Sequence, residues 1–283
     1  MGIGKLLNQL RVESSNKIAV YTAATNSFDD IFEPKWQSSD IDYFLYTDNP
    51  TENYNNIWNI KKIGFTYRDP RRLAKIFKLF PHYLFPNYKY SIWIDANLEI
   101  KNNLEEVVEQ YLDNNNYIAF FSHGKRTSIY EEADYCVRWG NDNKTIINNQ
   151  INRYKKQGYD AKNGLIAGRF IVRKHNDTRC IKLMNNWWDE IDNHSVRDQL
   201  SFNYISWRNK LEYAQINLDQ FHNKYFTINP HPRFIVYKDG GQSKVDLKIL
   251  KSKLKHMITS SKSYAILKNV FLRKLFKKIG IQR

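Results

Sequence analysis

A carboxylate and an amide, two residues apart, interrupt one of the most apolar segments of the chain. Residues 91–100 read SIWIDANLEI, which places Asp95 and Asn97 at the end of an apolar run. In an α/β sheet, a carboxylate at the carboxyl end of a strand lies at the edge where ligands bind. Two oxygen-bearing side chains separated by one small residue can face the same Mg²⁺ or Mn²⁺ ion, which prefers hard oxygen ligands. The simpler interpretation is that Asp95 and Asn97 cap the turn after a strand.

A basic helical face precedes that segment. Residues 71–84 read RRLAKIFKLFPHYL, and their apolar side chains recur at helical spacing. The basic side chains fall on the other side of the helix: Arg72, Lys75, Lys78 and His82. Arg72 and Lys75 are one turn apart, a spacing suited to phosphate groups, although a solvated face would show the same pattern. Pro81 predicts a break near Phe80.

The elements that must position these residues alternate between strands and helices. Short apolar runs rich in β-branched and aromatic residues predict strands at 17–25, 41–48, 90–96 and 117–122. Helical spacing predicts helices at 71–84, 104–112, 178–191 and 197–211. The Asn-rich stretches 53–59, 113–116 and 141–152 are interpreted as surface turns, and 226–236 as strand and loop. This alternation favours an α/β domain with a mainly parallel sheet flanked by helices, from residue 1 to about 240.

The positive charge of the chain is concentrated at one end. Of 44 Lys and Arg against 29 acids, residues 244–283 hold twelve basic residues and one acid, a net charge of +11, which leaves +4 for residues 1–243. Residues 264–281 combine lysines with apolar residues at helical spacing, which is typical of a basic amphipathic helix on an anionic membrane surface. A tail helix docked on its own domain is the alternative. A nucleic-acid partner is not expected, because such proteins place their basic surface on the folded domain.

Composition excludes several other classes of protein. The 283 residues contain 15% aromatic residues, too many for a disordered chain, and no run of 18 apolar residues that could span a membrane. Cys136 and Cys180 lack the spacing of a cysteine zinc site, and we interpret them as ordinary thiols. We expect a soluble, cytoplasmic protein, or one held peripherally on the cytoplasmic leaflet by residues 241–283.

Several blocks along the chain resemble a known family. The similarity is to GT-A fold glycosyltransferases, and more closely to the glycosyltransferase-like family shared by plant mucilage-related proteins and bacterial surface-polysaccharide proteins. It spans about residues 17–235. The matching blocks are 71–75 with His82, 90–97, His123, Arg126, 129–133, 164–165, 173–176 and 197–202. The family's second metal-binding Asp is the neutral Asn97 here.

The resemblance implies a site for a nucleotide-sugar and a divalent metal. Asp95 is the first metal ligand expected, with Asn97 as a second ligand or a ribose contact. A late histidine completes the metal shell in related enzymes, and His231 between two prolines is the candidate. The donor's base and ribose would lie against Thr22 and Ala23 in the first strand and against Asp48 after the second. Arg72 and Lys75 would then bind its phosphates.

The same resemblance assigns the catalytic side. Asp198 and Gln199 resemble the pair with which GT-A enzymes contact the donor sugar and the acceptor. If the reaction inverts the anomeric centre, Asp198 is the expected general base, with Glu131 or Glu132 in reserve. If it retains configuration, Asp198 would orient sugar hydroxyls. His123 and Arg126 would line the acceptor side or form a structural contact with a carboxylate.

The function expected on these grounds is transfer of a hexose from a nucleotide-sugar to an acceptor. The donor would be UDP-linked, the cofactor Mn²⁺ or Mg²⁺, and the acceptor a saccharide or lipid-linked sugar in surface polysaccharide synthesis. A non-catalytic protein that binds membranes or nucleic acid through its basic tail is the alternative, and it leaves Asp95 and Asp198 unexplained. A hydrolase with Asp95 as nucleophile would need a second Asp and a Ser or Thr with Lys, which we cannot place.

Overall fold

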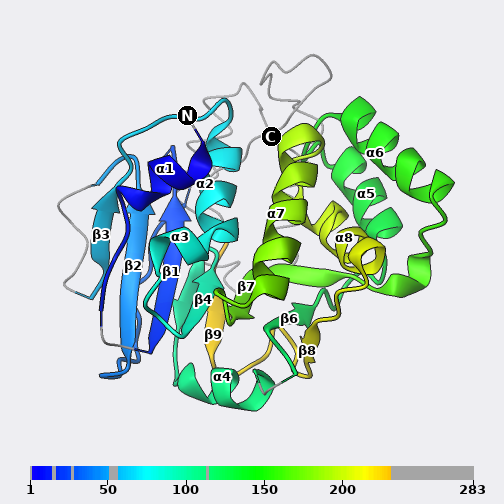
Figure 1. Cartoon of the computed structure of the whole chain (residues 1–283). Helices are drawn as coiled ribbons and strands as arrows, with labels where there is room; N and C mark the ends of the chain where they lie inside the picture. Colours follow the sequence, from blue (N-terminus) through cyan, green and yellow to red (C-terminus); the bar gives the residue numbers. More distant parts are fainter. Residues whose placement is uncertain (1, 15–16, 27–28, 51–56, 113–114, 231–283) are drawn as a thin grey trace, which may run out of the picture.

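A seven-stranded sheet forms the centre of the computed structural model, which describes residues 2–14, 17–26, 29–50, 57–112 and 115–230 (Figure 1). The strand order is β3-β2-β1-β4-β7-β6-β8, and β5 and β9 form a separate two-stranded sheet. The strands of the large sheet are β1 (Ile18–Ala24), β2 (Ile41–Thr47), β3 (Asn59–Lys62), β4 (Tyr90–Ile94), β6 (Ile118–Ser122), β7 (Ile166–Arg173) and β8 (Ala214–Ile216). The small sheet pairs β5 (Leu98–Ile100) with β9 (Phe226–Ile228).

All but one of the strands in the large sheet run in the same direction. β1, β2, β3 and β4 pair in parallel, as do β6 and β8, whereas β7 is antiparallel to both of its neighbours. The prediction of a mainly parallel α/β sheet flanked by helices is therefore confirmed. Parallel order brings the carboxyl ends of β1, β2, β4 and β6 to one edge, where ligands bind in such sheets.

Helices cover both faces of the sheet, because successive strand residues point to opposite sides. Tyr21 and Trp93 belong to one buried cluster, while their neighbours Val20 and Ile94 belong to the other. On the first face α2 packs against β1 and α7, and on the second α4 contacts β7 and β8. The helices are α1 (Ile3–Asn8), α2 (Pro70–Leu79), α3 (Pro81–Leu84), α4 (Glu105–Tyr111), α5 (Ile129–Arg138), α6 (Lys144–Lys156), α7 (Thr178–Asn193) and α8 (Phe202–Asn209), with short 3₁₀ turns η1 (Ala161–Asn163) and η2 (Asp198–Leu200).

Several sequence predictions of elements are confirmed, and others are wrong. The four expected strands exist, and the helix over 71–84 breaks at Pro81 into α2 and α3. The interpretation of 141–152 as a turn is wrong: Asn143 accepts a hydrogen bond from the N–H of Ile146 and so caps α6, whose buried face is Ile147, Gln150, Ile151 and Tyr154. The single helix expected over 197–211 is split into η2 and α8. Strands β3, β5, β7 and β8 were not predicted.

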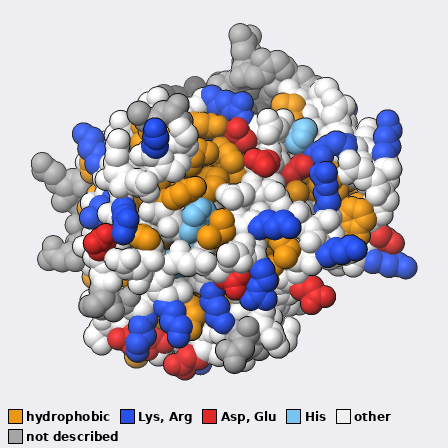
Figure 2. Space-filling model, viewed as in Figure 1, with side chains coloured by type: hydrophobic (Ala, Val, Ile, Leu, Met, Phe, Trp, Pro, Cys, Tyr) orange, Lys and Arg blue, Asp and Glu red, His pale blue; other side chains and the backbone are white. Residues whose placement is uncertain are grey.

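The surface seen in Figure 2 carries mixed charge. Lys and Arg side chains are scattered over this face among Asp and Glu, and they do not form one continuous patch. No helix in the described part of the chain has the length and apolar character needed to cross a membrane. The proposed domain boundary near residue 240 and the basic tail lie outside the described residues.

Candidate active site

Asp95 lies directly after β4, at the carboxyl edge of the sheet. Its backbone N–H donates to the carbonyl oxygen of Arg169 on the antiparallel strand β7, at 2.8 Å. Its Oδ1 accepts a hydrogen bond of 2.9 Å from the indole nitrogen of Trp93. The side chain remains 34% exposed.

Asn97 is more constrained than Asp95. Its amide nitrogen donates to the carbonyl oxygen of Asn229, and the Asn229 N–H donates back to the carbonyl oxygen of Asn97, at 2.7 and 2.9 Å. These bonds tie the turn after β4 to the end of β9, and they leave Oδ1 as the acceptor that Asn97 can offer.

The candidates for a Mg²⁺ or Mn²⁺ site among the described residues are Asp95 and Asn97. Both side chains carry oxygen, the donor that these ions prefer, and such ions complete their shells with water and substrate phosphates. No group of three or more His, Cys, Asp and Glu side chains placed to hold a metal occurs in the described part of the chain. His231, the third ligand expected, lies outside the described residues; it follows Asn229 by two positions in the sequence.

Asp198 is the most strongly paired carboxylate of the site. It opens η2 and is 5% exposed. Its Oδ2 accepts hydrogen bonds from the ammonium groups of Lys75 and Lys78, both on α2, at 2.7 and 2.5 Å. The same Lys78 ammonium lies 3.7 Å from Oδ1 of Asp95, and therefore links the two carboxylates. Gly168 of β7 leaves room for this arrangement, because a Cβ there would lie 3.1 Å from Lys78 Nζ and 3.2 Å from Asp198 Oδ2.

Lys78 corrects one expectation from the helical pattern. It was placed on the polar side of its helix, but its side chain is fully buried, with its ammonium over the rings of Trp93 and Trp187. The polar side of α2 faces the interior of the site here, and the long Lys side chain reaches its partners through apolar surroundings.

The electrostatics of the site follow from this packing. Burial alone would raise the pKa of Asp198, but Lys75, Lys78 and Arg197 outweigh it and hold that pKa well below its ordinary value. For Asp95, burial is again outweighed by the two lysines, and its pKa is lowered as well. Burial lowers the pKa of Lys78, which Asp198 counteracts. The pair of carboxylates is therefore ionised at neutral pH.

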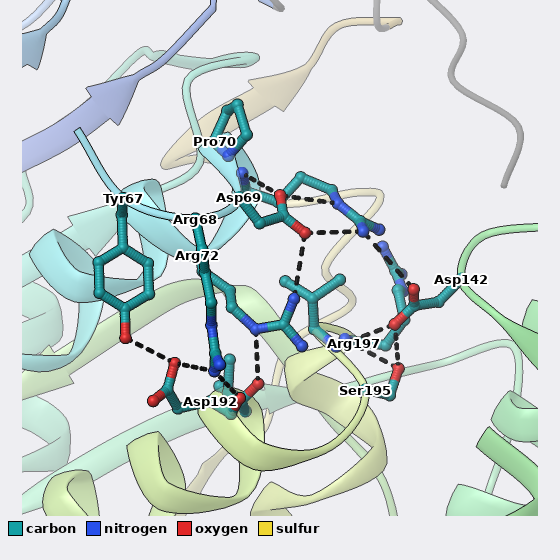
Figure 3. A network of polar contacts seen from close by, with 12 residues as sticks. Tyr67, Arg68, Asp69, Pro70, Arg72, Asp142, Asp192, Ser195 and Arg197 are labelled. Atoms are coloured by element: carbon teal, nitrogen blue, oxygen red, sulfur yellow. Dashed lines mark hydrogen bonds and ion pairs between the residues drawn. The ribbon is translucent and has the colours of Figure 1, made fainter. Parts of the chain in front are cut away.

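A polar network holds the segment that leads into Asp198 (Figure 3). Asp142, which is buried, accepts hydrogen bonds from the Ser195 hydroxyl at 2.7 Å and the Val196 N–H at 2.9 Å. Arg72 of α2 donates to the carbonyl oxygens of Ile191 and His194, at 3.1 and 2.6 Å. The turn between α7 and η2 is thereby fixed from two sides.

The same network bears on the phosphate contacts expected from sequence. Besides its bonds to the end of α7, Arg72 forms an ion pair of 3.1 Å with Asp69, the N-cap of α2, and Lys75 is bound to Asp198. Both cations thus have protein partners, and their binding of phosphates stays a prediction.

Gln199 contacts the first residue of β7, and the acceptor-side residues surround a second buried carboxylate. Gln199 donates from its amide to the carbonyl oxygen of Ile166 at 3.2 Å. Glu132 is fully buried; Arg126 donates to it at 2.5 Å, and Arg197 lies 3.6 Å from it. His123 lies 3.8 Å from the same carboxylate, and burial lowers its pKa to about 4. The structural contact between His123 and a carboxylate, one of the two interpretations considered, is therefore present.

Glu131, the reserve base, has a local structural role. Its carboxylate accepts hydrogen bonds from the backbone N–H and the hydroxyl of Thr127, at 2.7 and 3.2 Å. Its own N–H donates to Ser128, the N-cap of α5. This is an interaction of the capping-box type at the start of α5. A catalytic role for Glu131 stays a prediction.

The expected nucleoside contacts lie at the ends of β1 and β2. Thr22 and Ala23 are buried in the last half of β1, and the Thr22 hydroxyl has no hydrogen-bond partner in the described part of the structure. Asp48 is exposed after β2, and both of its oxygens accept from the N–H of Asn26, at 3.0 Å each. Asp48 thus holds the loop that follows β1, and its binding of the donor is untested.

Arg169 is a site residue that sequence reasoning missed. It stands on β7 next to Asp95, and burial lowers its pKa while Asp95 counteracts that effect. The signal in the sequence is a charged residue inside the apolar run LIAGRFIVR, at 165–173. A charge within a strand that lies in the middle of a sheet needs a partner or a ligand.

Comparison with known proteins identifies the family. A model described as the TOD1/MUCI70 glycosyltransferase-like domain matches residues 7–229, most of the chain. The chain belongs to the TOD1/MUCI70 family of glycosyltransferase-like domains. The α/β glycosyltransferase-like fold expected from the sequence is thereby confirmed.

The TOD1/MUCI70 domain also has a curated relative and a more distant structural neighbour. The protein named "Probable hexosyltransferase MUCI70" of Arabidopsis thaliana is 27% identical over 226 residues, which are 69% of this chain and 38% of that protein. The chain thus spans well under half the length of that relative. The apo structure of the bifunctional glycosyltransferase WbbM is 11% identical, with a TM-score of 0.37 over 62% of this chain and 35% of its own.

Proposed function

We propose that this protein is a glycosyltransferase that transfers a hexose from a UDP-linked or other nucleotide-sugar to a saccharide or lipid-linked acceptor, in the synthesis of a surface polysaccharide. Membership in the TOD1/MUCI70 family supports the reaction class, and the name of the Arabidopsis relative supports the hexose. The observation that carries the proposal is the joining of Asp95 and Asp198 by Lys78 at the carboxyl edge of the sheet.

The donor would lie across the ends of β1, β2 and β4. In this arrangement Thr22, Ala23 and Asp48 contact the nucleoside, and the diphosphate lies near Asp95. Asp95 and Asn97, with His231, are the residues that would hold Mn²⁺ or Mg²⁺. When bound, such an ion supplies positive charge to the phosphate oxygens of the leaving group.

Asp198 is better suited to orientation than to proton abstraction. A general base works best when its pKa lies near the working pH, and the two lysines shift the pKa of Asp198 away from it. We therefore favour the role in which Asp198 and Gln199 orient sugar hydroxyls. Lys75, whose side chain is 20% exposed, would face the donor from the same side.

The basic tail would bring the enzyme to its acceptor. Residues 244–283 carry +11, and each basic residue near an anionic leaflet contributes on the order of 1 kcal/mol. We propose that the tail binds the cytoplasmic leaflet, where lipid-linked sugars lie. A chain ending at Gly240 should stay folded and bind nucleotide, yet no longer co-sediment with vesicles of anionic phospholipid. Unfolding of this truncated chain, with no vesicle binding by the full chain, would instead indicate a tail docked on its own domain.

A binding screen tests the proposed function directly. Nucleoside diphosphates and nucleotide-sugars are added to the protein with Mn²⁺ or with EDTA, and the melting temperature is recorded, because a ligand that binds the native state raises it. Asp95→Ala should lose the Mn²⁺-dependent part of the shift, whereas Asp134→Ala, an exposed change on α5, should keep it. Absence of any shift with the wild-type protein would reject the proposal.

A further inference from the structure

Arg169 projects from an irregularity in β7 at the centre of the candidate site. Along β6, the partner of Phe120 is Ile171, whereas the partner of Phe121 is Ala167, so that residues 168–170 form a bulge. Bulges change the direction of side chains and are common beside active sites. The carbonyl oxygen of Arg169 accepts the N–H of Asp95, which places this residue beside the carboxylate at the end of β4.

Among the described residues, the guanidinium of Arg169 differs from the other cations of the site because no carboxylate lies within ion-pair distance of it. Lys75 and Lys78 bind Asp198, and Arg126 and Arg197 pair with Glu132. Within the described part of the chain, Arg169 makes no side-chain hydrogen bond or ion pair, and its guanidinium carbon lies 5.7 Å from the centroid of the Phe221 ring.

This imbalance leaves the cluster with excess positive charge. The cluster holds five cations and only three carboxylates. The carboxylates are those of Asp95, Asp198 and Glu132, and the cations are Lys75, Lys78, Arg126, Arg169 and Arg197. Arg169 is partly buried, and burial lowers its pKa, although a guanidinium still stays charged at neutral pH. A partly desolvated cation without a partner is unfavourable, and binding of an anion removes that cost.

We infer that Arg169 binds the diphosphate of the nucleotide-sugar donor and stabilises it as the leaving group. The inference rests on the proposed function. A guanidinium can form two parallel hydrogen bonds to a phosphate, and Arg169 lies at the sheet edge where the donor would bind. The phosphate-binding candidates expected from sequence, Arg72 and Lys75, are instead held by protein groups.

In the transfer step, the bond between the anomeric carbon and the diphosphate oxygen breaks, and its electron pair stays on that oxygen. The acceptor oxygen bonds to the anomeric carbon, and the acceptor proton is released with the nucleoside diphosphate. Arg169 binds the charge that accumulates on the diphosphate, so that it contributes in the transition state as well as in the ground state.

Calorimetric titration with UDP and with uridine tests this assignment. Arg169→Met should weaken UDP binding by about 10- to 100-fold, the size expected for loss of a hydrogen bond to a charged group, and leave uridine binding unchanged. The loss should persist both in Mn²⁺ and in EDTA, because it belongs to the side chain. Arg138→Met, an exposed change of equal charge on α5, is the matched control and should bind UDP as the wild type does.

The outcomes separate this inference from the proposed function. If wild-type protein binds UDP and Arg169→Met binds it equally well, the role of Arg169 is wrong and the proposed function stands. If wild type binds no nucleoside diphosphate, both fail. Equal losses for uridine and UDP would show a general disturbance of the site and reject the assignment. Arg169→Gln, a smaller change in shape, replaces Arg169→Met if thermal melting shows that the latter is unfolded.

Discussion

The Lys78 ammonium lies 2.5 Å from Oδ2 of Asp198, although the two residues are 120 positions apart in the chain. Lys78 comes from the end of α2, Asp198 from the turn after α7, and neither side chain is more than 7% exposed. An ion pair in such surroundings is costly to break, because each charge would be left without water or partner. The pair therefore couples the packing of α2 against α7 to the position of a candidate catalytic residue.

Replacing Lys78 should destabilise the whole domain. In Lys78→Met, Asp198 loses one of its two lysine partners, and we expect a loss of about 3 kcal/mol in the free energy of unfolding, the lower end of the range for a broken buried pair. The measurement is urea unfolding followed by circular dichroism. Because the pair is coupled, the double change Lys78→Met with Asp198→Asn should cost at least about 1 kcal/mol less than the sum of the single changes. Strict additivity would contradict the coupling.

A methyl group at position 168 should disturb the same pair. In Gly168→Ala, the new Cβ would lie 3.1 Å from Lys78 Nζ and 3.2 Å from Asp198 Oδ2, closer than most Cβ contacts in proteins, so that the ion pair would have to shift. We expect a loss of about 1–3 kcal/mol, the usual cost of overpacking, together with reduced transfer activity.

Gly64→Ala is the matched control, since a Cβ there meets nothing within 4 Å. Thermal melting and transfer activity of the two variants are compared with those of the wild type. If Gly168→Ala behaved like Gly64→Ala in both measurements, the close approach of β7 to the ion pair would be unimportant.

The sequence predicted the parallel part of the fold because local patterns carry that information. The runs at β1, β2, β4 and β6 are mostly apolar, as expected of strands buried on both faces. The start of α7 is local in the same way: either Asp177 or Thr178 could cap it by sequence, and the Asp177 side chain accepts the N–H of Arg179. In contrast, the sequence indicates a turn at α6, because its four apolar and aromatic side chains are diluted by Asn and Lys.

The site could be predicted only in part, because its decisive contacts join distant segments. Asp95 stands out beside an apolar strand, but nothing local shows that Lys78 reaches it from another element. Arg72 and Lys75 have the spacing of a phosphate-binding face, and only the packing of α2 against α7 reveals their protein partners. Arg169 was missed because the apolar run 165–173 was not recognised as a strand, and because the bulge around it has no signature in local composition.

Buried histidines should make the stability of the domain depend on pH. Burial lowers the pKa of His175 to about 3 and that of His123 to about 4. Both side chains stay neutral in the folded state, while they take up protons near pH 6.5 when unfolded. Their contribution to stability is therefore complete above pH 6.5 and is lost as the pH falls toward 4, by about 1.4 kcal/mol per pH unit for each histidine.

In His175→Gln, the free energy of unfolding should depend less steeply on pH, because the contribution of one of the two histidines to the slope is removed. Gln is chosen because its amide can still donate to the carbonyl oxygen of Phe85, the partner of His175 at 2.8 Å. The measurement is the free energy of unfolding in urea between pH 7 and pH 4.5. His222→Gln, at an exposed position with 86% of its side chain accessible, serves as the control. An unchanged slope in His175→Gln would contradict the prediction.

Asp198→Asn should reduce turnover much more than nucleotide binding. The change preserves shape but removes the charge that two lysines neutralise, and the sugar would be held less accurately as a result. We therefore expect kcat to fall by about 10²-fold, while the affinity for UDP stays nearly unchanged. Because Lys75 and Lys78 keep the pKa of Asp198 well below its ordinary value, the wild-type rate should show no acidic limb from this residue between pH 5 and 8. A limb in that range that Asp198→Asn abolishes, with a fall of up to about 10⁴-fold, would instead identify Asp198 as the general base. Loss of UDP affinity at an unchanged rate would exclude both roles and place Asp198 in donor binding.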